Sequence, residues 1–163
     1  MEIVLFRHGI AEPYNILGDG ERMLTAEGVA KVKKAAKGLK QLLLDRKRVV
    51  IFSSHLRRAL QTADLLTLVL KTRDRYIREE ISAGLFEELY FEWSRYHDDT
   101  TIIIVGHEPT LGAWLERMTS ERLAIAKGAA CAVTTRDLLI RATGKIQWYL
   151  TADALARIAK SND

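Results

Sequence analysis

Three short groups of polar residues, each directly after an apolar run, carry the side chains best suited to chemistry. The first group is Arg7-His8-Gly9, the second spans residues 53–58, and the third is Gly106-His107-Glu108-Pro109. Guanidinium groups match the oxygens of a phosphate and stay charged at physiological pH. A neutral imidazole can attack phosphorus, and a covalent intermediate divides one difficult displacement into two easier ones. The pattern therefore indicates phosphoryl chemistry, with His8 as the candidate nucleophile.

Neighbouring features also suit an anionic ligand. Gly9 lets the backbone approach a ligand closely, and Pro109 at the first position of a helix would leave adjacent N–H groups free. Nearby cations would lower the pKa of His8 and keep its imidazole neutral, ready to attack. Ser54 is either a helix cap or a further phosphate ligand. The residues that we expect to contact the phosphoryl group are Arg7, Gly9, Arg58, His107 and, in the second reading, Ser54.

The elements that must position these groups alternate between strands and helices. Apolar runs predict strands at 2–6, 49–52, 76–79, 101–105, 129–135 and 145–150. Apolar residues at helical spacing predict helices at 25–44, 56–70, 85–96, after Pro109 and, unless the end frays, at 153–160. This alternation predicts an α/β fold, a three-layer αβα sandwich around a central, mostly parallel sheet. Parallel strands would bring all three groups to one edge, where sites of such sheets form.

The composition is that of an ordinary globular chain. The length of 163 residues predicts one domain over residues 1–163. The single cysteine, Cys131, lies in an apolar stretch, which indicates a buried thiol and a reducing, cytoplasmic location. No apolar run approaches the length of a membrane span. The net charge of +4 is scattered over helices, so we expect neither nucleic acid nor membrane as a partner.

At these groups the chain resembles the histidine phosphatase superfamily, whose fold is also called phosphoglycerate mutase-like. Four motifs carry the resemblance in the family's order: Arg7-His8-Gly9, Leu24-Thr25-Ala26-Glu27-Gly28, the stretch 54–63, and Val105-Gly106-His107-Glu108-Pro109. The resemblance implies that His8 is the nucleophile and that His107 binds the phosphoryl group in the transition state. It also implies that Arg7 and Arg58 bind phosphate. Arg58 is assigned this role in preference to Arg57 because it occupies the arginine position of the motif.

The short length and the Gly-His-Glu-Pro form look most like the SixA branch, the small protein-phosphohistidine phosphatases. His55 stands where the family motif has a proline, and its role is open. Larger relatives carry a general-acid glutamate in an inserted region. Four candidates lie in about that stretch, and the sequence singles out none of them: Glu79, Glu80, Glu87 and Glu88. Phosphohistidine would suit a site without such an acid, because a protonated ring is a good leaving group.

These observations predict a hydrolase for phosphohistidine on a protein, or for a small phosphomonoester, that needs neither metal nor cofactor. A non-catalytic phosphate- or phosphoprotein-binding module on the same fold is the alternative. A metallohydrolase using His8, His107 and a carboxylate ranks last, since the sequence has no compact pair of metal ligands. The loop 10–23 either closes over substrate or is an ordinary connection. The physiological substrate and the oligomeric state are open.

Overall fold

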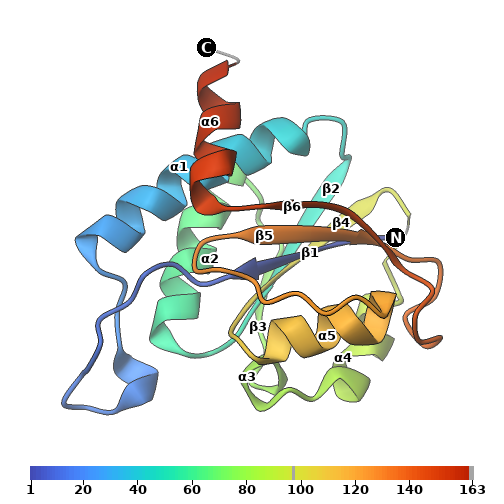
Figure 1. Cartoon of the computed structure of the whole chain (residues 1–163), viewed down its shortest axis with the longest axis horizontal. Helices are drawn as coiled ribbons and strands as arrows, with labels where there is room; N and C mark the ends of the chain where they lie inside the picture. Colours follow the sequence, from blue (N-terminus) through green and yellow to red (C-terminus); the bar gives the residue numbers. More distant parts are fainter. Residues whose placement is uncertain (97, 162–163) are drawn as a thin grey trace.

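A single sheet organises the computed structural model, which describes residues 1–96 and 98–161 (Figure 1). Its strands are β1 (Glu2–Arg7), β2 (Arg48–Ser53), β3 (Arg75–Ile77), β4 (Thr100–Gly106), β5 (Ala130–Thr134) and β6 (Lys145–Leu150). They lie in the order β3-β2-β4-β1-β5-β6. Strand β5 is antiparallel to both of its neighbours, and the other pairs are parallel. The prediction of a central, mostly parallel sheet is confirmed.

Helices cover both faces of this sheet. One face carries α1 (Ala26–Leu42), α2 (Arg57–Leu70) and α6 (Ala152–Ser161), and the other carries α3 (Glu80–Ala83), α4 (Phe86–Trp93) and α5 (Thr110–Thr119). Figure 1 places α1 and α6 above the strands and α3, α4 and α5 below them. Side chains of β1 alternate between the two layers, with Val4 on the α1 side and Ile3 on the α5 side, as the pleat requires. The three-layer αβα architecture is thereby confirmed.

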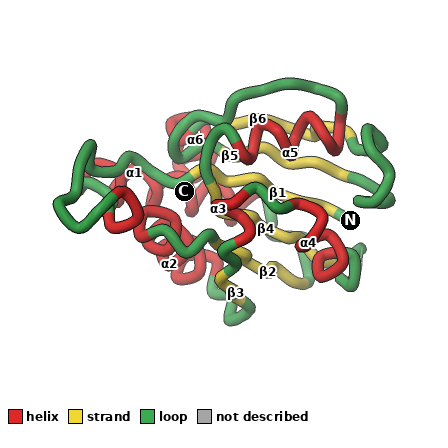
Figure 2. The backbone as a smooth tube through the Cα atoms, turned by 90° about the horizontal axis from the view of Figure 1, so that it is seen from below, coloured by secondary structure: helices red, strands yellow, loops and turns green. Residues whose placement is uncertain are grey.

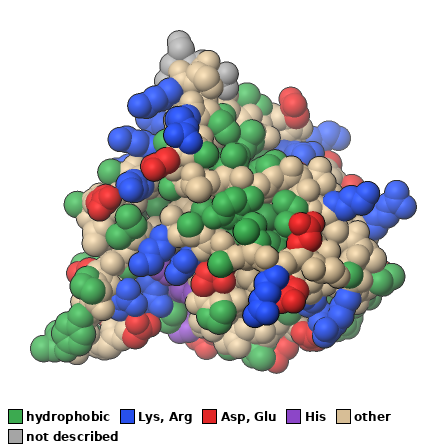
Figure 3. Space-filling model, in the orientation of Figure 1, with side chains coloured by type: hydrophobic (Ala, Val, Ile, Leu, Met, Phe, Trp, Pro, Cys, Tyr) green, Lys and Arg blue, Asp and Glu red, His purple; other side chains and the backbone are tan. Residues whose placement is uncertain are grey.

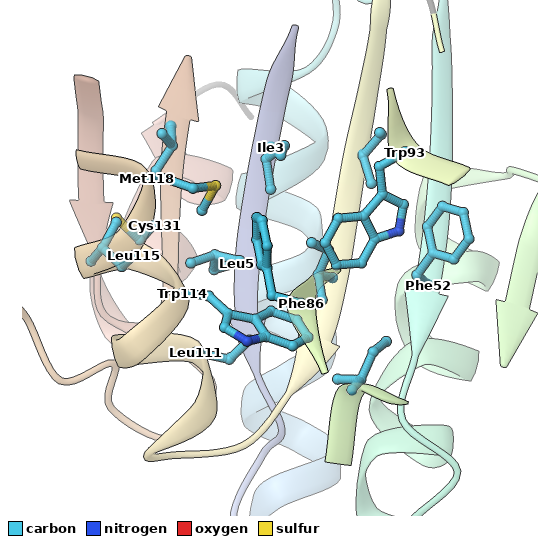
Figure 4. Packing of buried hydrophobic residues seen from close by; sticks show 14 of the residues in the cluster. Ile3, Leu5, Phe52, Phe86, Trp93, Leu111, Trp114, Leu115, Met118 and Cys131 are labelled. Atoms are coloured by element: carbon cyan, nitrogen blue, oxygen red, sulfur yellow. The ribbon is translucent and has the colours of Figure 1, made fainter. Parts of the chain in front are cut away.

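Several aromatic side chains pack together in the core between the sheet and the α3–α5 layer (Figure 4). The rings of Trp93 and Trp114 pack edge-on at 5.6 Å between centroids, and Phe86 contacts both of them. Such edge-to-face pairs stabilise a core beyond the area they bury. Cys131 is fully buried in the same cluster, and burial raises the pKa of its thiol to about 12. The thiol is therefore a core side chain, as expected.

The segment between β3 and β4 differs most from the sequence expectation. The predicted strand 76–79 is β3 at Arg75–Ile77, and the predicted helix 85–96 is α4 at Phe86–Trp93. The short helix α3 at Glu80–Ala83 was not predicted. Gly84 separates them with a φ of 76°, a left-handed conformation that ends α3. Strand β3 is a short strand at the sheet edge and pairs with β2 only.

Two features fix the position of α1 beside the end of β1. The side chain of Thr25 caps the helix by accepting a hydrogen bond from the amide of Gly28 at 3.0 Å. A Cβ on Gly28 would overlap the carbonyl of Ile10, and a Cβ on Gly9 would lie 2.6 Å from Val32. The glycines of the first two motifs therefore allow the chain after β1 to pass directly against α1. In the parts of the chain that the structure describes, no helix is long and apolar enough to span a membrane.

Candidate active site

The carboxyl ends of β2, β4 and β1 bring the three polar groups together. These strands are parallel neighbours, with Arg7 opposite Gly106 and Ser53 opposite Val105. The amide of His8 donates to the carbonyl of Gly106 at 3.1 Å, which continues the ladder one residue beyond the strands. The rings of His8 and His107 consequently lie 5.1 Å apart between centroids, tilted by 50°. The convergence expected from the strand ends is present in the structure.

The environment of His8 defines its protonation state. Its Nδ1 lies 2.7 Å from the carbonyl oxygen of Gly9. Because a carbonyl only accepts, Nδ1 carries the proton and Nε2 carries a free lone pair. Burial, together with Arg58, Arg7 and Lys127, lowers the pKa of His8 to about 4, although the bond to Gly9 acts in the opposite direction. At neutral pH the ring is uncharged and its Nε2 has a free lone pair.

His107 is held by Ser54 across the β2–β4 pair. Its Nε2 lies 2.8 Å from the Oγ of Ser54, which also accepts a hydrogen bond from the amide of Leu56 at 3.2 Å. The hydroxyl of Ser54 has a proton and a second lone pair, so it can either donate to Nε2 or accept from it. When it donates, the ring proton of His107 lies on Nδ1. Burial, and then His8 and the two arginines, lowers the pKa of His107 to about 3. His107 is therefore uncharged at neutral pH.

Hydrogen bonds within the protein hold the guanidinium groups of Arg7 and Arg58. Nη1 of Arg7 donates to the carbonyl of Ile125 at 3.0 Å. Arg58 is buried and donates from Nη1 to the backbone carbonyl of Asp19 at 2.9 Å and from Nη2 to its carboxylate at 3.2 Å. Asp19 lies in the short 3₁₀ helix η1 (Asp19–Glu21). These contacts orient the guanidinium groups and leave N–H groups of each for a ligand.

Several of the remaining donors are buried without a partner among the described residues. They are Nε of Arg7, Nε of Arg58 and Nδ1 of His107. A buried donor without an acceptor costs about 1–3 kcal/mol. Two such donors belong to permanent cations and the third to a ring beside His8, so a tetrahedral oxyanion fits this set. Within residues 1–96 and 98–161, no group of three His, Cys, Asp or Glu side chains is arranged to hold a metal ion.

Gly9 and Ser54 contribute in ways that their sequence context did not show. The amide of Gly9 donates to Oγ1 of Thr62 at 3.1 Å, so in this structure it is engaged inside the protein. Ser54 is fully buried, and Leu56, not Ser54, occupies the position before α2. Pro109 precedes the first helical residue of α5 instead of being that residue. Gly9 and Ser54 thus hydrogen-bond the rings of His8 and His107, respectively.

Within the described parts of the chain, His55 and the four glutamates make no hydrogen bond or ion pair with His8, His107, Arg7 or Arg58. His55 is exposed, and its Nδ1 lies 3.3 Å from Oγ of Ser82 on α3. Glu87 pairs with Arg117 on α5 at 2.6 Å. Glu80 precedes Ile81, a residue that packs against Gly106 next to His107. These positions give none of the four glutamates a contact that identifies it as a proton donor.

Three contributors to the site escaped the sequence analysis. Asp19 lies in the loop 10–23, outside every motif, and it bonds Arg58. Thr62 accepts from Gly9 and donates to the carbonyl of Arg58 at 2.7 Å, which ties two motifs together, and its place in the motif was the available signal. Lys127 lowers the pKa of His8 and precedes Gly128, whose amide donates to the carbonyls of Arg7 and His8. It lies outside every motif, so no local signal marked it.

The sequence pattern of the histidine phosphatase superfamily (branch 1) matches residues 3–101. The chain belongs to this superfamily. An uncharacterized protein from Picosynechococcus sp. is 34% identical to this histidine phosphatase over 121 residues, which are 71% of the chain and 72% of the relative. The family resemblance of the motifs is thereby confirmed.

Solved structures of phosphatases share the fold of this superfamily member. The protein histidine phosphatase SixA, complexed with tungstate, aligns with a TM-score of 0.80 at 20% identity, over 95% of this chain and 99% of SixA. A mycobacterial glucosyl-3-phosphoglycerate phosphatase aligns with a TM-score of 0.69 at 15% identity, over 92% of this chain and 98% of that one. At these identities the likeness concerns the fold, which is common to phosphatases with different substrates.

Proposed function

We propose that this histidine phosphatase hydrolyses the phosphoryl group of phosphohistidine on a protein, through a phosphohistidine intermediate on His8. The observation that carries the proposal is the pairing of a neutral His8 with His107 at 5.1 Å between ring centroids, flanked by two oriented arginines. A small phosphomonoester is the alternative substrate, since the same groups would bind its phosphoryl oxygens.

In the first step, Nε2 of His8 forms a bond to phosphorus while the bond from phosphorus to the leaving nitrogen breaks. The geometry supports this role because Nδ1 of His8 keeps its proton on Gly9 and directs the lone pair of Nε2 away from that bond. In the second step, water attacks phosphorus, the bond to Nε2 breaks, and inorganic phosphate leaves. The imidazole of His8 is restored, and no further reactant is required.

The remaining groups would stabilise charge on the transferring phosphoryl oxygens. Arg7 and Arg58 supply fixed positive charge, and Nδ1 of His107 supplies a neutral donor. Preoriented donors of this kind are typically worth about 10²–10³ in kcat each. Their orientation is set by Ile125, Asp19 and Ser54 before substrate arrives, so little reorganisation would accompany the reaction.

Asp19, the carboxylate that pairs with Arg58, supports a phosphoramidate substrate. Asp19 bonds both Arg22 and Arg58, and those bonds, that to Arg22 foremost, lower the pKa of its carboxyl group. An ionised carboxylate cannot protonate a leaving alkoxide. The imidazole of a phosphohistidine can instead take its proton from solvent and depart as a neutral ring, because its free nitrogen is basic.

Trapping the intermediate tests the proposal. The protein is incubated with a small protein carrying radiolabelled phosphohistidine and is quenched in alkali, in which a phosphoramidate survives. We expect a labelled enzyme that loses its label in acid and that is missing in His8→Ala. His55→Ala is the matched control, because this histidine is exposed and bonds only Ser82 among the contacts described above; it should label as the wild type does.

Three other outcomes would replace the proposal in whole or in part. Anion binding with no His8-dependent turnover of any phosphohistidine or phosphomonoester substrate would show a phosphate-binding module. Activity that is lost on exhaustive chelation and restored by a divalent metal would show a metallohydrolase. Rapid turnover of small phosphomonoesters, with none on phosphohistidine, would retain the His8 chemistry but assign the other substrate class.

A further inference from the structure

The loop between β1 and α1 exposes three large apolar side chains to solvent. Tyr14 is 73% exposed, Ile16 85% and Leu17 78%, and they lie within four consecutive residues. We call these three side chains the loop tip. Figures 1 and 2 show the loop projecting away from the sheet, and Figure 3 shows hydrophobic side chains at the corresponding lower-left corner. A gathered apolar protrusion of this kind is typical of an interaction site.

The loop tip is held in place by its own polar contacts. The amide of Gly18 donates to the carbonyl of Asn15 at 3.0 Å, closing a turn with Ile16 and Leu17 at its two central positions. The side chain of Asn15 accepts from the amide of Leu17 at 3.0 Å and donates to the carboxylate of Glu12. Gly18 has a φ of 116°, which glycine adopts without strain. The turn is thus built to present two apolar side chains outward.

The same loop reaches the phosphate-binding machinery. Leu17 is two residues from Asp19, so their Cα atoms are at most about 7.6 Å apart. Asp19 bonds both terminal nitrogens of Arg58 through its backbone carbonyl and its carboxylate. Arg22 bonds Asp19 at 2.9 Å and the carbonyl of Glu12 at 2.6 Å, which closes the base of the loop. The loop tip therefore stands at the mouth of the site, outside the space that a phosphoryl group would fill.

We propose that Tyr14, Ile16 and Leu17 form a docking surface for the protein that carries the phosphoryl group. The inference rests on the proposed function and extends it from the reacting group to the carrier. A phosphorylated side chain that reaches Arg58 brings the surface of its protein against the loop tip. A small phosphate ester bound at Arg58 does not extend that far. Apolar side chains that are already oriented lose little entropy when a partner covers them.

The charges around the loop tip favour a protein partner over an anionic membrane. Glu12, Asp19 and Glu21 flank the turn, and the carboxylate of Glu12 is fixed by bonds to Asn15 and to the amide of Met23. Arg22 pairs with Asp19 and Arg57 with Glu21, so the rim has no excess of basic side chains. Apolar segments that bind anionic lipid typically carry Lys and Arg around their apolar residues instead. Paired acidic and basic side chains around an apolar centre correspond to the polar rim and hydrophobic core of a protein interface.

Two substrates of different size test the docking surface. The triple variant Tyr14→Ser, Ile16→Ser, Leu17→Ser is compared with the wild type on free phosphoramidate and on a small protein phosphorylated at one exposed histidine. We expect kcat/KM for the phosphoprotein to fall roughly tenfold or more, mainly through KM, because apolar anchors dominate interface energies. We expect kcat/KM for phosphoramidate to stay within twofold, which also shows that the variant folds.

The matched control is Leu139→Ser with Ile140→Ser. Both side chains are about half exposed, and they follow β5, whose end pairs with Glu2 at the opposite edge of the sheet from the site. This double variant should leave both substrates unaffected. Unchanged phosphoprotein turnover in the triple variant would overturn the docking surface and leave the proposed function standing. Absence of turnover on both substrates in the wild type would instead reject the proposed function.

Other occupants of the loop tip would give distinct results. Cosedimentation of the wild type, but not the triple variant, with vesicles of phosphatidylglycerol and phosphatidylcholine would overturn the proposal in favour of a lipid surface. A dimer in analytical ultracentrifugation that dissociates in the triple variant would overturn it in favour of a second copy of the chain.

Discussion

The Oγ of Ser54 lies 2.8 Å from Nε2 of His107, at the neighbouring ends of β2 and β4. The amide of Ser54 also donates to the carbonyl of Val105 at 3.0 Å, so the hydroxyl is fixed by the sheet itself. Through these hydrogen bonds, the two central strands fix the orientation of the His107 ring, which faces His8. The orientation of His107 should therefore depend on Ser54.

Ser54→Ala should lower kcat about tenfold and destabilise the fold by roughly 1–3 kcal/mol, because Nε2 of the buried His107 loses its partner. The measurement is steady-state kinetics on phosphoramidate together with urea unfolding. Ser53→Ala is the control, since the Oγ of Ser53 donates only to the carbonyl of Ser54 among its described contacts. An equal loss of kcat in both variants would show that the effect is not specific to His107.

Two adjacent arginines should differ sharply in their importance. The side chain of Arg58 is 9% exposed and holds Asp19, whereas that of Arg57 is 53% exposed and lies 3.6 Å from Glu21. Arg58→Ala should lower kcat/KM by about 10²–10³, because one fixed donor of the transition state is removed. Arg57→Ala should stay within a few-fold. Arg58→Lys should recover little, since a point charge does not replace the planar fork. Comparable losses at both positions would contradict the assignment.

The low pKa of His8 should appear directly in a titration. Its pKa of about 4, set chiefly by burial, predicts that ring signals in NMR do not shift between pH 8 and about pH 5.5. The acid limb of kcat/KM should likewise begin only as pH approaches 4. Ring titration near the ordinary value of about 6.5 would show that the site is more open to water than the structure indicates.

The lowered pKa values of His8 and His107 make the stability of the fold depend on pH. The native state keeps His8 and His107 neutral down to about pH 4 and 3, whereas unfolded histidines bind protons below about pH 6.5. The unfolded state therefore binds more protons within that window, and the free energy of unfolding falls as pH drops below 6.5. Urea unfolding at pH 7 and pH 5 measures this loss. It should be smaller in a His8→Phe variant, which removes one of the two groups.

Gly38 should not tolerate the substitution that helices normally favour. Replacing an interior helical glycine by alanine usually stabilises a helix by roughly 1 kcal/mol. Here a Cβ on Gly38 would overlap the carbonyl of Leu155, where α1 and α6 cross. Gly38→Ala should therefore destabilise the protein by about 1–3 kcal/mol, as overpacking does. Gly20→Ala, whose Cβ would meet only Leu56 at 3.5 Å, is the control and should leave the unfolding midpoint unchanged.

Patterns with a strong period predicted their elements closely. The strand expected at 101–105 is β4 at Thr100–Gly106, and the helix expected at 56–70 is α2 at Arg57–Leu70. A continuous apolar run and apolar residues at helical spacing each leave few alternative assignments of secondary structure. The stretch 76–96 was less accurate. Its short edge strand and the turn at Gly84 depend on neighbours in the fold, which a local pattern does not contain.

For the site, the sequence alone determined which side chains meet. Arg7, His8, Arg58 and His107 stand at the ends of apolar runs or within family motifs, and parallel strands must bring such ends to one edge. That inference needs only strand direction, which alternation with helices implies. The same motifs also identified the superfamily, because their order along the chain is a local property.

Only the tertiary structure decided the chemical state of those side chains. The neutral His8 depends on burial and on Lys127, 119 positions away, and the orientation of Arg58 depends on Asp19, 39 positions before it. Ser54 became a partner of His107 through the β2–β4 register, not through its own neighbours in sequence. Desolvation and hydrogen bonding depend on distances in space, and packing of distant segments sets those distances.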